Sequence, residues 1–301
     1  MKLDKLTDLP LNRDNFDDYV TCVAFSPDGT QLASVTRFSL VQLWDLKSGK
    51  EKNRFQGTSE SWKIIFSSDG GHLAVASDSG VFLWNINNSK SQFFNHAGKS
   101  IAFHPLQNIM ASFSGGDGGF VDIRNLDTNS DVKAIGHTYA VNKLAFNFDG
   151  SILGTISDKN LYLWWGDHLA KISQPASDFA FFAEKDVLVS CYENNVYMWD
   201  IESPNFYSPI QIRHKLSSYY VYDLKVIPRR NFLAWNTNNH NLNVNIWNIS
   251  SDELFQKSFG FEMRFGMNFI FSPDGKTMAI CGESQQGKRL AGDIQIWELI
   301  D

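Results

Sequence analysis

The segment from Gly282 to Arg289 carries the residue types closest to those of a phosphate-binding loop. Its glycines and lysine follow the spacing Gly-x-x-x-x-Gly-Lys, but Arg289 stands where such a loop needs a Ser or Thr hydroxyl for magnesium. A phosphate loop also needs a following helix whose N-terminus faces the phosphates. Here the residues from Asp293 to Trp297 have the pattern of a strand. We therefore expect a long polar hairpin loop at 282–289 and no nucleotide cofactor.

The residue types that bind metals do not occur at metal-binding spacings. The histidines show neither His-x-His nor His-Glu-x-x-His, and the cysteines show no Cys-x-x-Cys. The segment Asp127 to Asp131 begins like a calcium loop, yet Val132 replaces its turn glycine and Thr138 its bidentate glutamate. We predict no metal site. We expect reduced, buried thiols at Cys22, Cys191 and Cys281.

Residues for acid-base or nucleophilic catalysis are equally sparse. The chain has no Gly-x-Ser-x-Gly elbow. Paired carboxylates such as Asp17-Asp18 are expected to lie in solvated surface loops. We predict that the chain has no catalytic residues and is not an enzyme.

An internal repeat organises the elements around these residues. Seven units recur, each with an apolar strand ending near a Phe, a tight turn, a second apolar strand, and a third strand ending near a Trp. The third-strand anchors lie 35 to 50 residues apart: Trp44, Trp84, Arg124, Trp164, Trp199, Trp247 and Trp297. The first-strand anchors count the same units: Phe25, Phe66, Phe103, Phe146, Phe181, Val226 and Phe271. Four units carry an Asp-Gly turn, whose Gly reaches positive φ without steric cost. Each unit is predicted to be an antiparallel β-meander.

Two of the units, VAFSPDGTQLAS with VQLWDL at 23–46 and FIFSPDGKTMAI with IQIWEL at 269–299, resemble WD repeats. The resemblance covers essentially the whole chain, although Asp follows the Trp only at Asp45 and Asp200. It implies an all-β, seven-bladed β-propeller of four-stranded antiparallel blades, forming a single domain over residues 1–301. The expected blade cores are 19–56, 60–95, 98–135, 139–173, 176–213, 220–259 and 265–301.

The fourth strand of the seventh blade is expected from the N-terminal segment. The sequence stops directly after that blade's third strand, while residues 2–10 precede blade one with the spacing that fourth strands show elsewhere. We expect residues 2–10 to complete blade seven, because this pairing hides a sheet edge and closes the ring.

The resemblance also implies a structural hydrogen-bond set in blade four. In WD repeats a His, a strand Ser or Thr, a turn Asp and the Trp bond together and stiffen the blade. Only one blade can supply all four, and its residues are His137, Thr155, Asp158 and Trp164. A catalytic triad of the His, Thr and Asp is the alternative, but the family uses this set to hold the blade together.

Composition limits the partners and the compartment. The formal net charge is −6 and the basic residues are scattered, so we expect no broad attraction to nucleic acid or to anionic membranes. The N-terminus has acidic residues where a signal peptide needs apolar ones, and no later run is long enough for a membrane span. We expect a cytoplasmic protein without membrane insertion.

Aromatic and Met residues gather where the first strands of four blades begin. In the proteins that the chain resembles, partners commonly bind on the face with the loops that enter these strands. Two aligned positions, six and four residues before the first-strand anchor, give a partner-binding arc over blades six, seven, one and two. Its members are Tyr19, Trp62, Tyr220, Tyr222, Phe265 and Met267. Arg37 and Tyr192, at or near the position that precedes the turn Asp, are expected to extend the partner-binding surface. Large side chains with few rotors are typical of interaction hot spots.

The function expected from these features is a protein-interaction scaffold or adaptor, which binds a peptide or domain and belongs to a complex. An RNA-associated or translation-associated propeller is one alternative, but only Lys99 and Arg37 provide basic character on this face. A propeller enzyme with a small substrate is the other, and it would need Glu60, Glu193 and His240 to converge from separate blades. No small-molecule substrate and no cofactor are predicted.

Overall fold

The computed structural model describes residues 1–9, 18–57, 59–95, 100–114, 119–182, 187–201, 210–215, 221–239, 241–262, 268–284 and 294–300. The described residues form β-strands joined by turns and contain no helix. The chain divides into two compact units, one with residues 1–99, 240–242 and 259–301, the other with residues 100–239 and 243–258. That residues 1–301 form a single domain stays a prediction.

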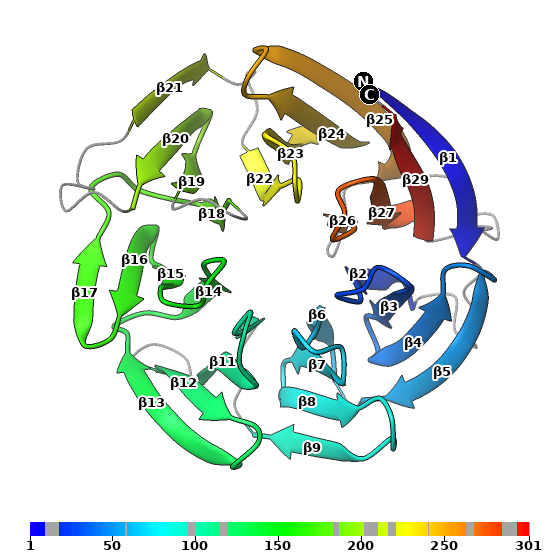
Figure 1. Cartoon of the computed structure of the whole chain (residues 1–301), viewed down its shortest axis with the longest axis vertical. Coiled ribbons are helices and arrows are strands. Elements are labelled where there is room, and N and C mark those ends of the chain that lie inside the picture. Colours follow the sequence, from blue (N-terminus) through cyan, green and yellow to red (C-terminus); the bar gives the residue numbers. More distant parts are fainter. Residues whose placement is uncertain are drawn as a thin grey trace. The chain divides into compact units, whose positions relative to one another are not determined.

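Unit 1 contains the sheets of blades one, two and seven (Figure 1). Blade one has β2 (Val20–Phe25), β3 (Gln31–Thr36), β4 (Leu40–Asp45) and β5 (Lys50–Gln56). Blade two has β6 (Ser61–Phe66), β7 (His72–Ser77), β8 (Gly80–Asn85) and β9 (Ser91–Phe94). Blade seven has β26 (Asn268–Phe271), β27 (Thr277–Cys281), β29 (Ile294–Ile300) and β1 (Lys2–Leu9). All neighbouring strands pair antiparallel, as the repeat predicts.

Unit 2 contains the sheets of blades three, four and five and most of blade six. Blade three has β10 (Ile101–Phe103), β11 (Ile109–Ser114), β12 (Phe120–Asn125) and β13 (Ser130–Gly136). Blade four has β14 (Val141–Phe146), β15 (Leu153–Ser157), β16 (Asn160–Trp165) and β17 (His168–Lys171). Blade five has β18 (Asp178–Phe181), β19 (Val187–Tyr192), β20 (Asn195–Asp200) and β21 (Ile210–Lys215). Blade six has β22 (Val221–Val226), β23 (Phe232–Asn239), β24 (Asn241–Asn248) and β25 (Glu253–Glu262).

The turn chemistry explains why the first two strands of a blade fold back on each other. In blade one, Gly29 takes a φ of 71° and its N–H donates to the Ser26 carbonyl at 2.9 Å. The Asp28 carboxylate accepts the Thr30 N–H at 3.0 Å and the Ser26 hydroxyl at 2.5 Å. These bonds hold the pKa of Asp28 below its usual range. The Ser-x-Asp-Gly sequence thus closes the hairpin with its own side chains.

The core of unit 1 lies between neighbouring sheets. Trp84 of blade two packs against Phe55 of blade one with ring centroids 5.7 Å apart. Leu43 and Leu73 are fully buried in the same cluster. Burying one such side chain contributes about 1.5–3 kcal/mol, so the interface between the blades is a main source of stability.

The N-terminal strand confirms the closure predicted from the sequence. β1 pairs antiparallel with β29, from Lys2 opposite Ile300 to Leu9 opposite Ile294, and Figure 1 shows the two strands side by side in blue and red. Leu9 is completely buried, whereas Leu6, at an irregularity in the register, is 55% exposed. The pairing buries the outer edge of β29.

One sheet departs from the predicted four strands. The expected hairpin loop at 282–289 begins with a short strand, β28 (Glu283–Ser284), which pairs with the end of β25. Phe261 lies opposite Ser284 and Glu262 opposite Glu283. Blade six therefore has five strands. The prediction missed β28 because two polar residues have no strand periodicity, and the unusually long β25 provides the edge that they pair with.

Candidate protein interface

A bulge sets the direction of the side chains at the start of the inner strands. The register between the first and second strands shifts between Val20 and Cys22 in blade one and between Ser61 and Lys63 in blade two. The bulged residues, Thr21 and Trp62, are those that stand four positions before the strand anchor. A bulge re-aims one side chain. Thr21 is buried and donates to the Val35 carbonyl at 3.2 Å, whereas Trp62 is only half-buried.

The turn between β3 and β4 is held by a buried carboxylate. Asp18 is 6% exposed, and it accepts the Thr36 hydroxyl at 2.7 Å and the Phe38 N–H at 2.8 Å. The Phe38 carbonyl accepts the Gln56 side-chain amide at 2.9 Å. The expectation that Asp18 is a solvated surface residue is therefore wrong, because its partners lie 18 and 20 residues further along the chain. Asp17 lies outside the described residues.

This turn presents Arg37 and Phe38 beside the entry to blade two. The Arg37 Nε donates to Glu60 Oε1 at 2.8 Å, and its guanidinium carbon lies 5.5 Å from the centroid of the Phe38 ring. The Phe38 side chain is 41% exposed. The Ser61 N–H donates to the Arg37 carbonyl at 3.1 Å, which joins the turn to blade two.

The indole of Trp62 is fixed on the same surface by a carboxylate. Its Nε1 donates to Asp78 Oδ1 at 2.7 Å. The Asp78 N–H donates to the Glu60 carbonyl at 2.9 Å, so the turn after β7 and the residues before β6 lie together. Tyr19, half-buried, accepts the Arg37 N–H on its carbonyl at 2.9 Å. We refer to Tyr19, Arg37, Phe38, Glu60, Trp62 and Asp78 as the Trp62 patch.

The structure describes part of the predicted arc. Tyr19, Arg37 and Trp62 lie in the Trp62 patch, within unit 1. Tyr192 is half-buried at the end of β19 in unit 2. Tyr220, Phe265 and Met267 lie outside the described residues, as does the side chain of Tyr222. Phe38 and Asp78 were missed by the sequence reasoning, although both stand in the turns between second and third strands that the turn Asp marks.

Comparison with known proteins identifies repeats of a known kind in three segments of the chain. The family model described as WD domain, G-beta repeat matches residues 12–45, 49–85 and 130–164. The solved structure titled "Crystal structure of RRP9 WD40 repeats" superposes with a TM-score of 0.75 at 16% identity, over 99% of this chain and 100% of that one. The chain thus contains WD repeats at these three sites. Its fold is the seven-bladed β-propeller that the repeat predicted.

Curated relatives match shorter segments of this WD-repeat chain. Pre-mRNA-processing factor 19 homolog 2 of Arabidopsis thaliana is 38% identical over 91 residues, which are 29% of this chain and 17% of that protein. Small ribosomal subunit protein RACK1z of Arabidopsis thaliana is 37% identical over 73 residues, 24% of this chain and 22% of that protein. The chain thus matches less than a quarter of the length of either relative.

The hydrogen-bond set expected in blade four of the WD-repeat fold forms only in part. The Trp164 Nε1 donates to Thr155 Oγ1 at 3.0 Å, and the His137 ring meets the Trp164 ring edge-on at a centroid distance of 5.5 Å. The His137 Nε2 is buried without a hydrogen-bond partner, and burial lowers the pKa of this histidine. Asp158 is exposed at a φ of 47°, and no described residue bonds to its carboxylate. Including Asp158 was wrong, because its turn directs the carboxylate to solvent.

The Trp-to-hydroxyl bond recurs in other blades. The Trp44 Nε1 donates to Ser34 Oγ at 3.1 Å, and the Trp199 Nε1 donates to Ser190 Oγ at 2.9 Å. Both serines are completely buried on the second strand of their blade. The sequence reasoning missed them because it required all four members, whereas a Trp and a Ser facing each other across the strand pair suffice to satisfy the indole N–H.

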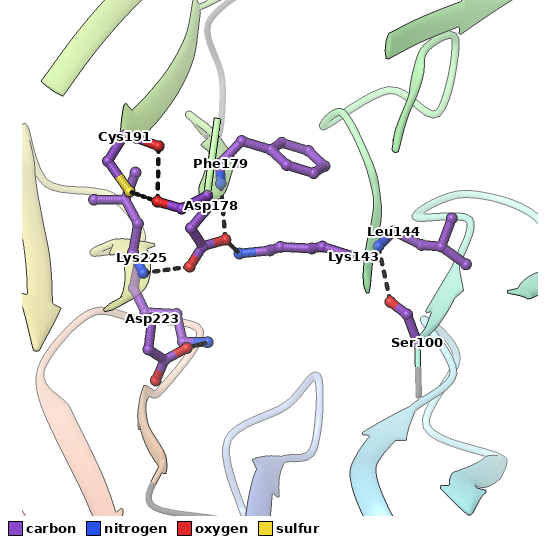
Figure 2. A network of polar contacts seen from close by, with 10 residues as sticks. Ser100, Lys143, Leu144, Asp178, Phe179, Cys191, Asp223 and Lys225 are labelled. Atoms are coloured by element: carbon purple, nitrogen blue, oxygen red, sulfur yellow. Dashed lines mark hydrogen bonds and ion pairs between the residues drawn. The ribbon is translucent and has the colours of Figure 1, made fainter. Parts of the chain in front are cut away.

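Charged side chains on the inner strands of unit 2 are used to join blades (Figure 2). Asp178 Oδ1 accepts the Lys143 ammonium and the Phe179 N–H, and Oδ2 accepts the Leu224 N–H at 2.7 Å. The aligned Ser100 of blade three accepts the Leu144 N–H at 2.8 Å. Both Asp178 oxygens thus hold protein donors, and this carboxylate serves to connect blades four, five and six.

The residues that a propeller enzyme would need have other surroundings or lie outside the described residues. Glu60 binds Arg37, Glu193 is exposed in a turn of unit 2, and His240 lies outside the described residues. Burial raises the pKa of the Cys191 thiol to about 12, so this cysteine is a poor nucleophile. Among the described residues no three His, Cys, Asp or Glu side chains are arranged to hold a metal ion. In that same part of the chain, no helix has the length and apolar character that crossing a membrane requires.

Proposed function

We propose that the chain is a non-catalytic scaffold that binds a peptide or domain of another protein on the Trp62 patch. WD-repeat propellers typically serve protein interaction, and the patch adds a specific location. The observation that carries the proposal is the exposed Phe38 ring, which lies beside Arg37. The backbone of Phe38 is held by hydrogen bonds with the side chains of Asp18 and Gln56.

The turn supports binding because it is already ordered. A loop that must be immobilised on binding costs free energy, and a loop fixed by its own hydrogen bonds avoids most of that cost. Trp62 is fixed in the same way by Asp78. Trp, Arg and other large side chains with restrained rotamers dominate interface energies. The Trp62 patch combines two aromatic rings and an arginine of this kind.

The test is quantitative capture of partners by the tagged, folded chain. The Phe38→Ala/Trp62→Ala variant is compared with wild type and with Leu106→Ala, which removes a 73% exposed side chain of unit 2. We expect at least one protein captured by wild type to be lost from the double variant and retained by Leu106→Ala. Retention of every captured protein by a double variant with native circular dichroism would refute the proposal.

An RNA-associated role is the second candidate, favoured by relatives whose names refer to pre-mRNA processing and to the small ribosomal subunit. The net charge of −6 and the carboxylates of the Trp62 patch speak against direct RNA contact. Filter binding of a random-sequence RNA at 50 and 200 mM salt separates the two. Salt-sensitive retention at micromolar protein would favour the RNA role.

A cytoplasmic location forms part of the proposal. Cys22, Cys191 and Cys281 are all free thiols and all buried, which fits a reducing compartment. Fractionation of cells that express the tagged chain tests this location.

A further inference from the structure

The first hairpin turn of blade three, between β10 and β11, lacks the carboxylate that closes this turn in other blades. In blades one, two, four and seven, an Asp side chain accepts a turn N–H at 2.8 to 3.0 Å; these residues are Asp28, Asp69, Asp149 and Asp274. Leu106 stands at this position in blade three, and Gln107 stands where the other four turns have Gly. The backbone donors of this turn therefore need another acceptor.

The imidazole of His104 is that acceptor. Its Nδ1 accepts the N–H groups of Leu106 and Gln107, each at 3.1 Å. A ring nitrogen that accepts carries no proton, so the proton of the neutral ring is on Nε2. His104 is 8% exposed, and its own N–H donates to the Ile109 carbonyl at 2.8 Å. The closed turn is thus built around a neutral, buried histidine.

The same ring contacts blade four. Its centroid lies 5.3 Å from that of the Phe146 ring. A Cβ atom on Gly150 would lie 2.0 Å from the His104 Nε2, so the ring fills space that is open only because residue 150 is a glycine. The ring of His104 therefore connects the blade-three turn to the first hairpin turn of blade four.

Two carboxylates lie on the elements around His104. Asp149 belongs to the blade-four turn, and Asp127, between β12 and β13, accepts the Asn108 side-chain amide at 2.7 Å. Burial lowers the pKa of His104, while the charge of Asp149 and a backbone hydrogen bond at Gly150 raise it by less. Hydrogen bonds from Ser151 hold the pKa of Asp149 below its usual range. Between pH 7.5 and 5.5 the change of charge at this turn thus falls on His104.

We infer that His104 makes the contact between this turn and blade four sensitive to acid. When Nδ1 gains a proton, it changes from an acceptor into a donor and faces the N–H groups of Leu106 and Gln107. Both hydrogen bonds are lost, and a charged ring is unfavourable in the buried space at Gly150. The ring then leaves that space and the turn opens. This inference concerns unit 2 and does not depend on the proposed function.

Hydrogen exchange followed by mass spectrometry measures the opening, with each rate corrected for the intrinsic exchange rate at that pH. The peptide over 103–110 reports this turn, and the peptide over 25–32 is the internal control because its turn acceptor is Asp28. An ordinary His pKa of about 6.5 in the open turn limits the increase in opening to about tenfold between pH 7.5 and 5.5. We expect the protection of 103–110 to fall about three- to tenfold, and that of 25–32 less than about twofold.

Two variants assign the effect to one imidazole. His104→Asn places an amide oxygen near the position of Nδ1, as Asn147 does in blade four, where its Oδ1 accepts the Ile152 N–H at 2.9 Å. This variant should keep the turn closed at both pH values. His137→Asn removes another buried histidine of unit 2 whose pKa is lowered, and it should leave the pH dependence of 103–110 unchanged.

The tautomer of the wild-type ring gives an independent check. In a long-range ¹H–¹⁵N spectrum at pH 7.5, His104, assigned through its contact with Phe146, should carry its proton on Nε2. Equal pH dependence of the two peptides, or a proton on Nδ1 at pH 7.5, would overturn the inference. Unchanged pH dependence in His104→Asn, or its loss in His137→Asn, would do the same. The two wild-type measurements decide the inference even where His104→Asn does not fold.

Discussion

Replacing Asp18 by Asn tests whether the Trp62 patch depends on a buried carboxylate. Asp18 is 6% exposed, and among the described residues it accepts hydrogen bonds from the Thr36 hydroxyl at 2.7 Å and from the Phe38 N–H at 2.8 Å. An Asn side chain has one acceptor oxygen and turns its NH₂ group toward the second donor. The turn then loses one bond and keeps one unsatisfied donor.

The size of the effect follows from these two bonds. Leaving a buried donor unsatisfied costs about 1–3 kcal/mol, and a hydrogen bond to a charged group contributes about 1.5–3 kcal/mol. We expect Asp18→Asn to lower the free energy of unfolding by about 2 kcal/mol. The same substitution at the exposed Asp158 should change it by less than about 0.5 kcal/mol.

Urea unfolding followed by Trp fluorescence measures both variants against wild type. A shift of the midpoint at an unchanged slope would indicate a loss of stability alone. Because the same turn carries Phe38, partner capture by Asp18→Asn should also fall under conditions where the variant is fully folded. An Asp18→Asn variant as stable as Asp158→Asn would refute the role given to this carboxylate.

Three further perturbations test other parts of the fold. Leu9→Ala should lower the free energy of unfolding in urea by about 2–5 kcal/mol, because Leu9 is completely buried where β1 pairs with β29. Leu6→Ala, at a 55% exposed position of the same strand, should lower it by less than about 0.5 kcal/mol. Desolvation lowers the pKa of both His104 and His137 in the folded chain, so protons bind the unfolded chain more readily. The contribution of these two histidines to the free energy of unfolding should be complete above about pH 6.5 and should decrease as the pH falls from there through the lowered pKa values. The urea midpoint should therefore be lower at pH 5.5 than at pH 7.5. Because burial raises the pKa of Cys191 to about 12, iodoacetamide at pH 8 should leave it unmodified in the native chain and alkylate it in urea, as peptide mass spectrometry would show.

Much of the strand order could be predicted because each strand carries its own signal. The Trp anchors, the Phe anchors and the Asp-Gly turns repeat with the blades, and the pairing of β1 with β29 follows from counting strands. Arg124 occupies the third strand of blade three although it replaces the Trp, since the alternation around it is unchanged. Local pattern therefore suffices where the structure repeats.

The site was harder to predict because its side chains act through distant partners. In the sequence, Asp18 is one of two adjacent loop carboxylates. In the structure it is a buried acceptor, because the β3–β4 turn places the Thr36 hydroxyl and the Phe38 N–H beside it. Asp158 fits an alignment with the WD-repeat hydrogen-bond set, yet its exposure removes it from that set. Phe38 enters the proposed interface only through its exposure beside Arg37. Backbone geometry, which has no fixed sequence signal, decides all three.

Site-specific photocrosslinking tests the central proposal most directly. Phe38 is replaced by p-benzoylphenylalanine, and the variant is irradiated in cell extract beside a control with the same replacement at Leu254, which is 59% exposed in unit 2. Scaffold binding at the Trp62 patch predicts a discrete crosslinked protein from position 38 that is absent from position 254 and is lost with Trp62→Ala. The same crosslinks from both positions, or none from position 38, would contradict it.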